Sequence, residues 1–234
     1  IIGASKLRAI KEELSEDFPM PRLRFPKYYQ ELSNRHVLVS ELIEGQTLEQ
    51  GIINSNLDWD DLLELFRIHG AFMFGVGTFH GDLHPGNCIL DPRGNLVFID
   101  NGAICEAPRK VSRSLFNFFL HLSSGDKDMA FESLISLAER RPRSDKVEEF
   151  KRDMHDIYQD FENLSVGEQS LTEVMMKTVR SAVENAGADY GEEGFPIIRS
   201  LMYMDGLVIR TYPEVKLISE MRDSLDEFKS GLKL

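Results

Sequence analysis

The chain has 234 residues, of which 42% are hydrophobic and 28% are charged, a composition that predicts a globular protein with room for one large domain. Its 39 acidic residues outnumber 27 lysines and arginines, so the formal net charge is −12, and no dense basic run occurs in it. We therefore expect neither a nucleic-acid backbone nor an anionic membrane surface to be its main partner.

The first 45 residues combine a helix, a connector and a hairpin. The charged stretch 5–17 predicts the end of a helix, and the proline-rich stretch 18–26 predicts a connector. Residues 28–30 and 36–42 predict the two arms of a β-hairpin, since the second arm is apolar and rich in β-branched residues. Gly45 ends this hairpin, because glycine permits a sharp change of direction.

The remainder is predominantly helical. Asp58 predicts the N-cap of a helix whose apolar residues recur at three- and four-residue spacing, and Gly75 and Gly77 predict its end. After Pro108 the helical period returns in six further segments, separated by short breaks that contain Gly, Pro or Asp: 109–123, 127–140, 145–163, 169–187, 195–211 and 214–230. No run of about 18 apolar residues occurs, so we expect no segment to span a bilayer.

A second hairpin carries the candidate chemistry. Residues 88–90 and 96–99 are short apolar strands joined by the strong turn sequence DPRGN. Pairing these strands brings Asn87 beside Asp100, where an amide oxygen and a carboxylate can reach one hard cation. Asp82 lies five residues before Asn87, in the loop that enters the same end of the hairpin. The arrangement predicts a magnesium site that receives a phosphoryl group, with an acid beside it.

These residues resemble a known motif. HGDLHPGN at 80–87, followed by IDNG at 99–102, is similar to the catalytic loop and metal-binding motif of the protein-kinase-like superfamily, in which H-x-D-x-x-x-x-N precedes D-F-G. The flanking segments FPKYYQELSNRHVLVSELIEG and LLELFRIHGAFMFGVGTFHGDLHPGN resemble the UbiB-like atypical kinase family, which is associated with isoprenoid-quinone biosynthesis. This resemblance extends over about residues 20–230.

The resemblance implies an α+β fold, namely a protein-kinase-like C-terminal lobe that is mainly helical and has two short β-hairpins. Residues 46–234 would form this lobe, with the catalytic loop and metal motif at 80–102. Residues 1–45 would form a helix end, a connector and the hairpin beside the hinge, as a remnant of the N-terminal lobe.

The resemblance also implies roles for individual residues. Asp82 would be the catalytic acid that orients the nucleophile or accepts its proton. Asn87 and Asp100 would hold Mg, with Asp100 as the principal ligand. The backbone of Glu41, Leu42 and Ile43 would bind the adenine of ATP as the hinge does in kinases, while His80 and Gly102 would support the loop and the metal motif.

Two departures from the motif stand out. Asn101 replaces the usual Phe, which removes an apolar plug behind the metal site, and we predict that Asn101→Phe is tolerated if the space there is apolar. No glycine- or alanine-rich phosphate loop, no strand lysine and no K-x-G-Q helix precedes the first hairpin, and the sequence begins with Ile1. We therefore expect a piece of a longer protein, inactive by itself.

Three functions remain open. The first is an ATP- and Mg-dependent atypical kinase or ATPase that supports isoprenoid-quinone or lipid biosynthesis, with an isoprenoid lipid or a membrane-associated biosynthetic complex as a partner. The second is a small-molecule phosphotransferase of the aminoglycoside or choline kinase type, and the third is a non-catalytic kinase-like scaffold. Cys88 and Cys105 lack zinc spacing and predict reduced thiols, hence an intracellular protein that is cytoplasmic or peripherally membrane-associated.

Overall fold

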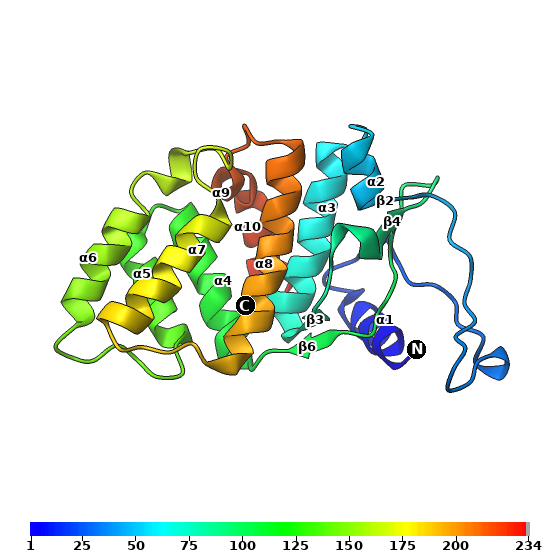
Figure 1. Cartoon of the computed structure of the whole chain (residues 1–234), viewed down its shortest axis with the longest axis horizontal. Coiled ribbons are helices and arrows are strands. Elements are labelled where there is room, and N and C mark those ends of the chain that lie inside the picture. Colours follow the sequence, from blue (N-terminus) through cyan, green and yellow to red (C-terminus); the bar gives the residue numbers. More distant parts are fainter. Residues whose placement is uncertain (233–234) are drawn as a thin grey trace.

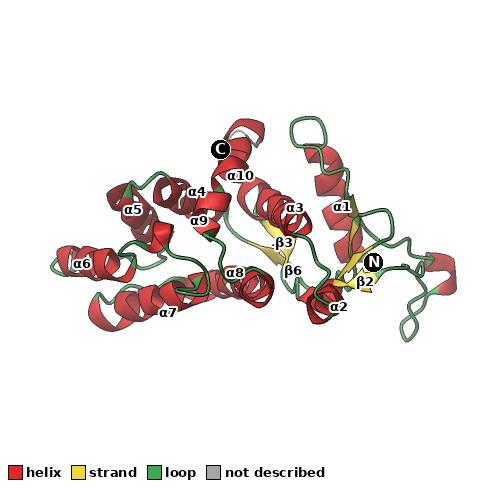
Figure 2. Ribbon diagram, turned by 90° about the horizontal axis from the view of Figure 1, so that it is seen from above, coloured by secondary structure: helices red, strands yellow, loops and turns green. Residues whose placement is uncertain are grey.

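Helices occupy most of the chain, and two small sheets lie toward one end of it (Figure 1). The structure is a computed structural model and describes residues 1–232. Among these residues, no helix combines the length and the apolar character needed to cross a membrane. Figure 2 shows α7 (Leu171–Arg180) and α8 (Gly191–Thr211) on one side of the molecule, with α4 (Arg109–Ser123), α5 (Lys127–Leu137) and α10 (Arg222–Gly231) opposite them.

The helices begin and end as follows: α1 (Ile2–Leu14), α2 (Leu48–Ile53), α3 (Trp59–Gly70), α4 (Arg109–Ser123), α5 (Lys127–Leu137), α6 (Val147–Ile157), α7 (Leu171–Arg180), α8 (Gly191–Thr211), α9 (Leu217–Glu220) and α10 (Arg222–Gly231). Two π-helical turns continue α3 and α7, namely η2 (Ala71–Val76) and η5 (Ser181–Asn185). Three 3₁₀ turns complete the helical elements: η1 (Gln30–Leu32), η3 (Pro85–Asn87) and η4 (Phe161–Asn163). After η2 the backbone reverses at Gly77, whose positive φ of 80° suits glycine, as the sequence predicts.

The strands are short: β1 (Leu23–Arg24), β2 (Gln46–Thr47), β3 (Thr78–His80), β4 (Cys88–Leu90), β5 (Leu96–Phe98) and β6 (Ile104–Glu106). The larger sheet has the order β1-β5-β4-β2, and its centre is the predicted β4–β5 hairpin, with Cys88 opposite Phe98. β1 adds to β5 in parallel, and β2 adds to β4 antiparallel. The smaller sheet pairs β3 with β6, so that the catalytic-loop sequence leaves one strand and the metal motif enters the other.

One hydrophobic core joins the N-terminal segment to the helical lobe. Ala4 and Leu7 of α1 are fully buried and belong to the same cluster as the aromatic residues of η2, α4 and α10. Phe74 is the centre of that aromatic group, because its ring lies 5.7–6.2 Å from those of Phe116, Phe119 and Phe228. A division of the chain after residue 45 stays a prediction.

The first predicted hairpin forms only in part, and no regular strand spans 36–42. Its arms pair around an isolated antiparallel bridge between Tyr28 and Ser40, where Tyr29 N–H donates to the Val39 carbonyl and Glu41 N–H to the Lys27 carbonyl, while η1 begins at the last residue of the first arm. The apolar side chains of the second arm find no sheet to cover them, since Val37 is 52%, Leu38 59% and Leu42 87% exposed. An apolar, β-branched sequence forms a strand only where a neighbour buries one of its faces, and no described element does so here.

The predicted helices are present, with altered limits. The segment predicted over 145–163 breaks at Asp160, which adopts a positive φ of 55°, so α6 and η4 are separate. The segment predicted over 214–230 divides into α9 and α10. The predicted connector 18–26 contains β1, because its apolar residues Leu23 and Phe25 are buried and Leu23 pairs with Leu96.

Candidate functional site

The β4–β5 hairpin places Asn87 and Asp100 at one end, as predicted. The backbone N–H of Ile99 donates to the carbonyl of Asn87 at 2.9 Å and closes the hairpin directly before Asp100. The side-chain Nδ2 of Asn87 donates to the carbonyl of Asp82 at 2.9 Å, which ties the preceding loop to the same end. The amide oxygen of Asn87 forms no hydrogen bond with any residue from 1 to 232 and is free to bind a ligand.

Asp100 has an available carboxylate. Its backbone adopts a left-handed conformation, with φ of 49°, which is uncommon outside glycine and is concentrated in functional sites. The side chain is exposed, and no described residue forms a hydrogen bond or an ion pair with it. Gly102 lies beside this carboxylate, since a Cβ on Gly102 would stand 3.5 Å from Asp100 Oδ1.

His80 connects the loop to the hairpin from inside the protein. Its ring is fully buried and packs edge-to-face on Phe98, with the centroids 6.0 Å apart. Nδ1 lies 3.2 Å from the backbone nitrogen of Asp82, and Nε2 lies 3.3 Å from the carbonyl oxygen of Ile99. Burial lowers the pKa of His80, against the hydrogen bond to Ile99 and the nearby carboxylates, so the ring is neutral. A neutral ring fits these contacts, because Nδ1 accepts and Nε2 donates.

Asp82 is half-buried and is held from a helix far away in the sequence. The hydroxyl of Tyr203 on α8 donates to Asp82 Oδ1 at 3.0 Å, and Arg199 on the same helix donates to the carbonyl of Gly81 at 2.7 Å. The sequence analysis missed both residues. A polar pair four residues apart in a mainly apolar helix was the available signal, but it does not say what the pair contacts.

The predicted hinge and the metal motif line a common cleft of about 370 Å³. Glu41, Leu42 and Ile43 form one part of its wall, and residues 100–102 form another. Within the described chain, no hydrogen bond uses the carbonyl of Glu41 or the N–H groups of Leu42 and Ile43. Edge-on recognition of an aromatic base needs backbone groups of this kind, a donor and an acceptor close together.

The carboxylate of Glu41 is already occupied. It pairs with Arg24 at 3.0 Å and accepts the backbone N–H of Lys27 at 3.0 Å. The hydrogen bond from Lys27, followed by that from Arg24, holds the pKa of Glu41 below its usual value in spite of partial burial. The one charged side chain of the predicted hinge therefore anchors the segment, whereas the Glu41 carbonyl and the N–H groups of Leu42 and Ile43 are unused among residues 1–232.

The space around Asn101 is polar, contrary to the premise of our prediction for Asn101→Phe. The side chain is only 4% exposed, and its Nδ2 donates to the carbonyl of Phe98 at 2.7 Å. Nδ2 also lies 3.5 Å from the hydroxyl of Tyr28, while the buried Oδ1 has no partner. Asn101 thus donates a hydrogen bond to the end of β5 at the position where the superfamily motif has an apolar ring. A Phe side chain could not form this hydrogen bond.

The donor set fits magnesium bound together with a nucleotide. Within residues 1–232, no three His, Cys, Asp or Glu side chains come together as a metal site. Asp100 and Asn87 instead supply one carboxylate and one amide oxygen, and neither group is committed to another residue. Magnesium typically takes one or two carboxylates and completes its shell with substrate phosphates and water.

The sequence of this chain is similar to those of known kinase-like proteins. Residues 4–134 match the family described as ABC1 atypical kinase-like domain. Protein ACTIVITY OF BC1 COMPLEX KINASE 3 of Arabidopsis thaliana is 26% identical over 204 residues, which cover 83% of this chain and 27% of that protein. Probable protein kinase UbiB of Histophilus somni is 22% identical over 220 residues, which cover 88% of this chain and 39% of that protein.

A solved structure of a Mycobacterium tuberculosis protein with erythromycin is 18% identical, with a TM-score of 0.48, over 88% of this chain and 56% of that chain.

The helical lobe, with its catalytic-loop sequence and its metal-motif hairpin, is that of a kinase-like protein, and the predicted α+β class is confirmed. The chain belongs to the ABC1 atypical kinase-like domain family, with relatives named as UbiB-type kinases. It spans 27% and 39% of the lengths of the two relatives above.

Proposed function

We propose that the protein containing this chain is an ATP- and Mg-dependent kinase or ATPase, and that this chain supplies the C-lobe half of its nucleotide site. The observation that carries the proposal is the cleft that residues 41–43, which have unused backbone groups, line together with Asp100, whose carboxylate is unpaired. One wall suits a base and the other a metal–phosphate group, which are the two ends of a nucleotide.

Each residue then has a role. Asp100 and Asn87 would hold Mg, which neutralises charge on the phosphates and aligns them for transfer. Asp82 would orient the attacking hydroxyl or water and take its proton. Residues 41–43 would bind the adenine through the backbone. The neutral ring of His80 would keep the Asp82 loop at a fixed distance from the end of β5.

The resemblance to UbiB-like kinases extends the proposal to the biological setting. We propose that the activity supports isoprenoid-quinone or lipid biosynthesis inside the cell, with an isoprenoid lipid or a membrane-associated biosynthetic complex as the partner. The protein would then be cytoplasmic or would bind a membrane peripherally. The family match favours this assignment over a phosphotransferase of the aminoglycoside or choline type.

The test is calorimetric titration of the full gene product with ATP, with and without Mg. Asp100→Asn is nearly isosteric and removes the charge, so it should weaken Mg-dependent binding by about 10- to 100-fold, which corresponds to one charge-assisted contact. Asp223→Asn is the matched control, because it makes the same change at an exposed position of α10 outside the cleft. Unchanged Mg-dependent binding by Asp100→Asn would refute the metal assignment, and no nucleotide binding by the wild type would favour a non-catalytic scaffold.

A further inference from the structure

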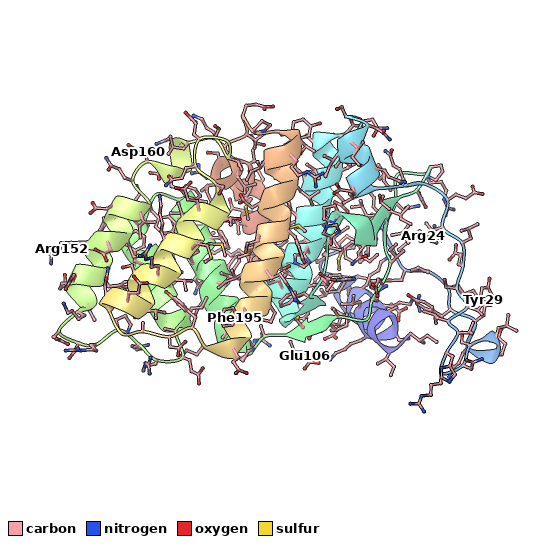
Figure 3. The ribbon with its side chains drawn as sticks, viewed as in Figure 1. Arg24, Tyr29, Glu106, Arg152, Asp160 and Phe195 are labelled. Carbon is pink, nitrogen blue, oxygen red and sulfur yellow. The ribbon has the colours of Figure 1, made fainter. Side chains whose placement is uncertain are left out.

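α8 is a helix of the lobe that contacts the catalytic loop through two polar side chains. Figure 1 shows it as a long helix that runs beside α3, with β3 and β6 next to its lower half, and Figure 3 marks the lower end by Phe195. Arg199 and Tyr203 are four residues apart and therefore lie one turn apart on one face of the helix. Both contact the sequence Gly81-Asp82.

The contact with Asp82 is selective for one of its oxygens. Tyr203 donates to Oδ1 at 3.0 Å, whereas Oδ2 has no hydrogen-bond partner among residues 1–232. Asp82 as a whole is half-buried, so the residue keeps contact with solvent. A carboxylate fixed through one oxygen cannot rotate freely, and its second oxygen then points in a constant direction.

Tyr203 is itself restrained on two sides. Its ring packs edge-to-face with His84, with the centroids 5.7 Å apart and an interplanar angle of 88°. His84 is in turn fixed within the loop, since its Nδ1 accepts the backbone N–H of Gly86 at 3.0 Å. Partial burial, and then the hydrogen bond and negative charge of Asp82, raise the pKa of Tyr203, so the phenol keeps its proton and remains a donor at neutral pH.

Arg199 secures the backbone of the same loop. Its guanidinium donates to the carbonyl of Gly81, one residue before the carboxylate that Tyr203 holds. The two bonds restrain different parts of the loop, because one holds the main chain and the other holds the reacting side chain. Neither residue reaches the hinge segment or Asp100 through any described contact, so the pair restrains the loop at Gly81 and Asp82.

We propose that Tyr203 is a positioning residue that fixes Asp82 Oδ1 and thereby aims Oδ2 at the phosphoryl acceptor. This inference rests on the proposed function. In the transfer step the acceptor oxygen forms a bond to the γ-phosphorus, the bond between that phosphorus and the bridging oxygen of ADP breaks, and the acceptor proton passes to Asp82 Oδ2. The Tyr203 hydroxyl donates throughout and gives up no proton.

The test compares Tyr203→Phe with Tyr212→Phe in the full gene product. Both changes remove one hydroxyl from a half-buried tyrosine at or near α8, but Tyr212 donates to the carbonyl of Leu57 at 2.8 Å and not to the loop. We expect Tyr203→Phe to lower kcat for Mg-ATP turnover by about tenfold, as the loss of a hydrogen bond to a charged group does, with KM for ATP changed by less than about twofold. Tyr212→Phe should leave kcat unchanged.

Two further measurements separate positioning from stability. In an Asp82→Asn background, Tyr203→Phe should have no additional effect on kcat, because the group it positions is gone. The carboxyl ¹³C resonance of Asp82 should shift in Tyr203→Phe and stay in place in Tyr212→Phe. A wild-type kcat in Tyr203→Phe, or an equal loss in the Asp82→Asn background, would refute the positioning role while leaving the nucleotide site intact. A wild type without Mg-ATP binding and turnover would refute the proposed function and this inference with it.

Discussion

Gly81 occupies a position with no room for a methyl group, which makes Gly81→Ala a strong test of the packing around the catalytic loop. A Cβ built on Gly81 would lie 2.1 Å from Cys105 Sγ and 3.3 Å from the carbonyl oxygen of Ala103. Favourable non-bonded contacts need about 3.5–4 Å, so the sulfur must move by well over about 1 Å. The backbone cannot yield easily, because Gly81 N–H donates to the Ala103 carbonyl at 2.7 Å.

Overpacking of this kind typically lowers the free energy of unfolding by about 1–3 kcal/mol, and we expect Gly81→Ala to fall in that range. Cys105→Ala removes the clashing sulfur and leaves its Cβ at a tight but tolerable 3.3 Å. The free energy of unfolding of the double variant should therefore lie within about 0.5 kcal/mol of that of Cys105→Ala alone. The effects of the two changes would then be strongly non-additive.

The assay is urea unfolding of the wild type, both single variants and the double variant, followed by circular dichroism. Gly206→Ala in α8 is the control, because nothing lies within 4 Å of its added methyl group, and it should stabilise the helix by about 0.5–1 kcal/mol. Additive effects of Gly81→Ala and Cys105→Ala would show that the sulfur does not limit this position, and the packing argument would fail.

Three further predictions address the site and the buried histidine. Asn101→Phe deprives the buried Phe98 carbonyl of its donor, so it should lower the free energy of unfolding by about 1–3 kcal/mol; a Tm at or above that of the wild type would contradict this. Burial, and then the nearby His80, lower the pKa of His69 to about 3. Between about pH 6.5 and pH 3 the unfolded state therefore binds one proton at His69 that the folded state does not bind, and the free energy of unfolding should fall as the pH drops through this range. His69→Gln should remove this part of the pH dependence in unfolding titrations, and an unaltered slope would assign it to other groups. Isolated residues 1–234 should fold but bind Mg-ATP with a Kd no tighter than millimolar, since the resemblance assigns further phosphate contacts to an N-lobe. NMR titration measures this Kd, and micromolar binding that is lost in Asp100→Asn would show that these residues form a nucleotide site without an N-lobe.

The sequence predicts those parts of the structure that depend on contacts between residues close together in the chain. The DPRGN turn between two apolar runs predicted the β4–β5 hairpin, and pairing alone then brought Asn87 and Asp100 to one end. Helices with a clear apolar face were predicted for the same reason. The roles of these residues stay predictions, although the structure brings the hinge segment and the metal motif to one cleft.

The features that the sequence does not predict depend on contacts between residues far apart in the chain. The stretch 36–42 has the composition of a strand, but it pairs only around the Tyr28–Ser40 bridge, and its side chains Val37, Leu38 and Leu42 stay exposed. Tyr203 contacts Asp82 across a sequence separation of 121 residues, and no local pattern encodes such a pairing. Comparison with the D-F-G motif shows only that Asn101 replaces a Phe ring. The hydrogen bond that the buried amide of Asn101 donates to the Phe98 carbonyl cannot be predicted from the sequence.

The ion pairs of Arg24 have a mechanical consequence. This one side chain, seen at the right of the molecule in Figure 3, binds Asp91 at 2.9 Å in the β4–β5 turn and Glu41 at 3.0 Å in the hinge segment, while its backbone pairs with β5. Residues 41–43 and the β4–β5 hairpin are thereby tied together through one side chain. In the proposed nucleotide site, these ties would hold the distance between the hinge backbone and Asp100 constant while other parts of the site move.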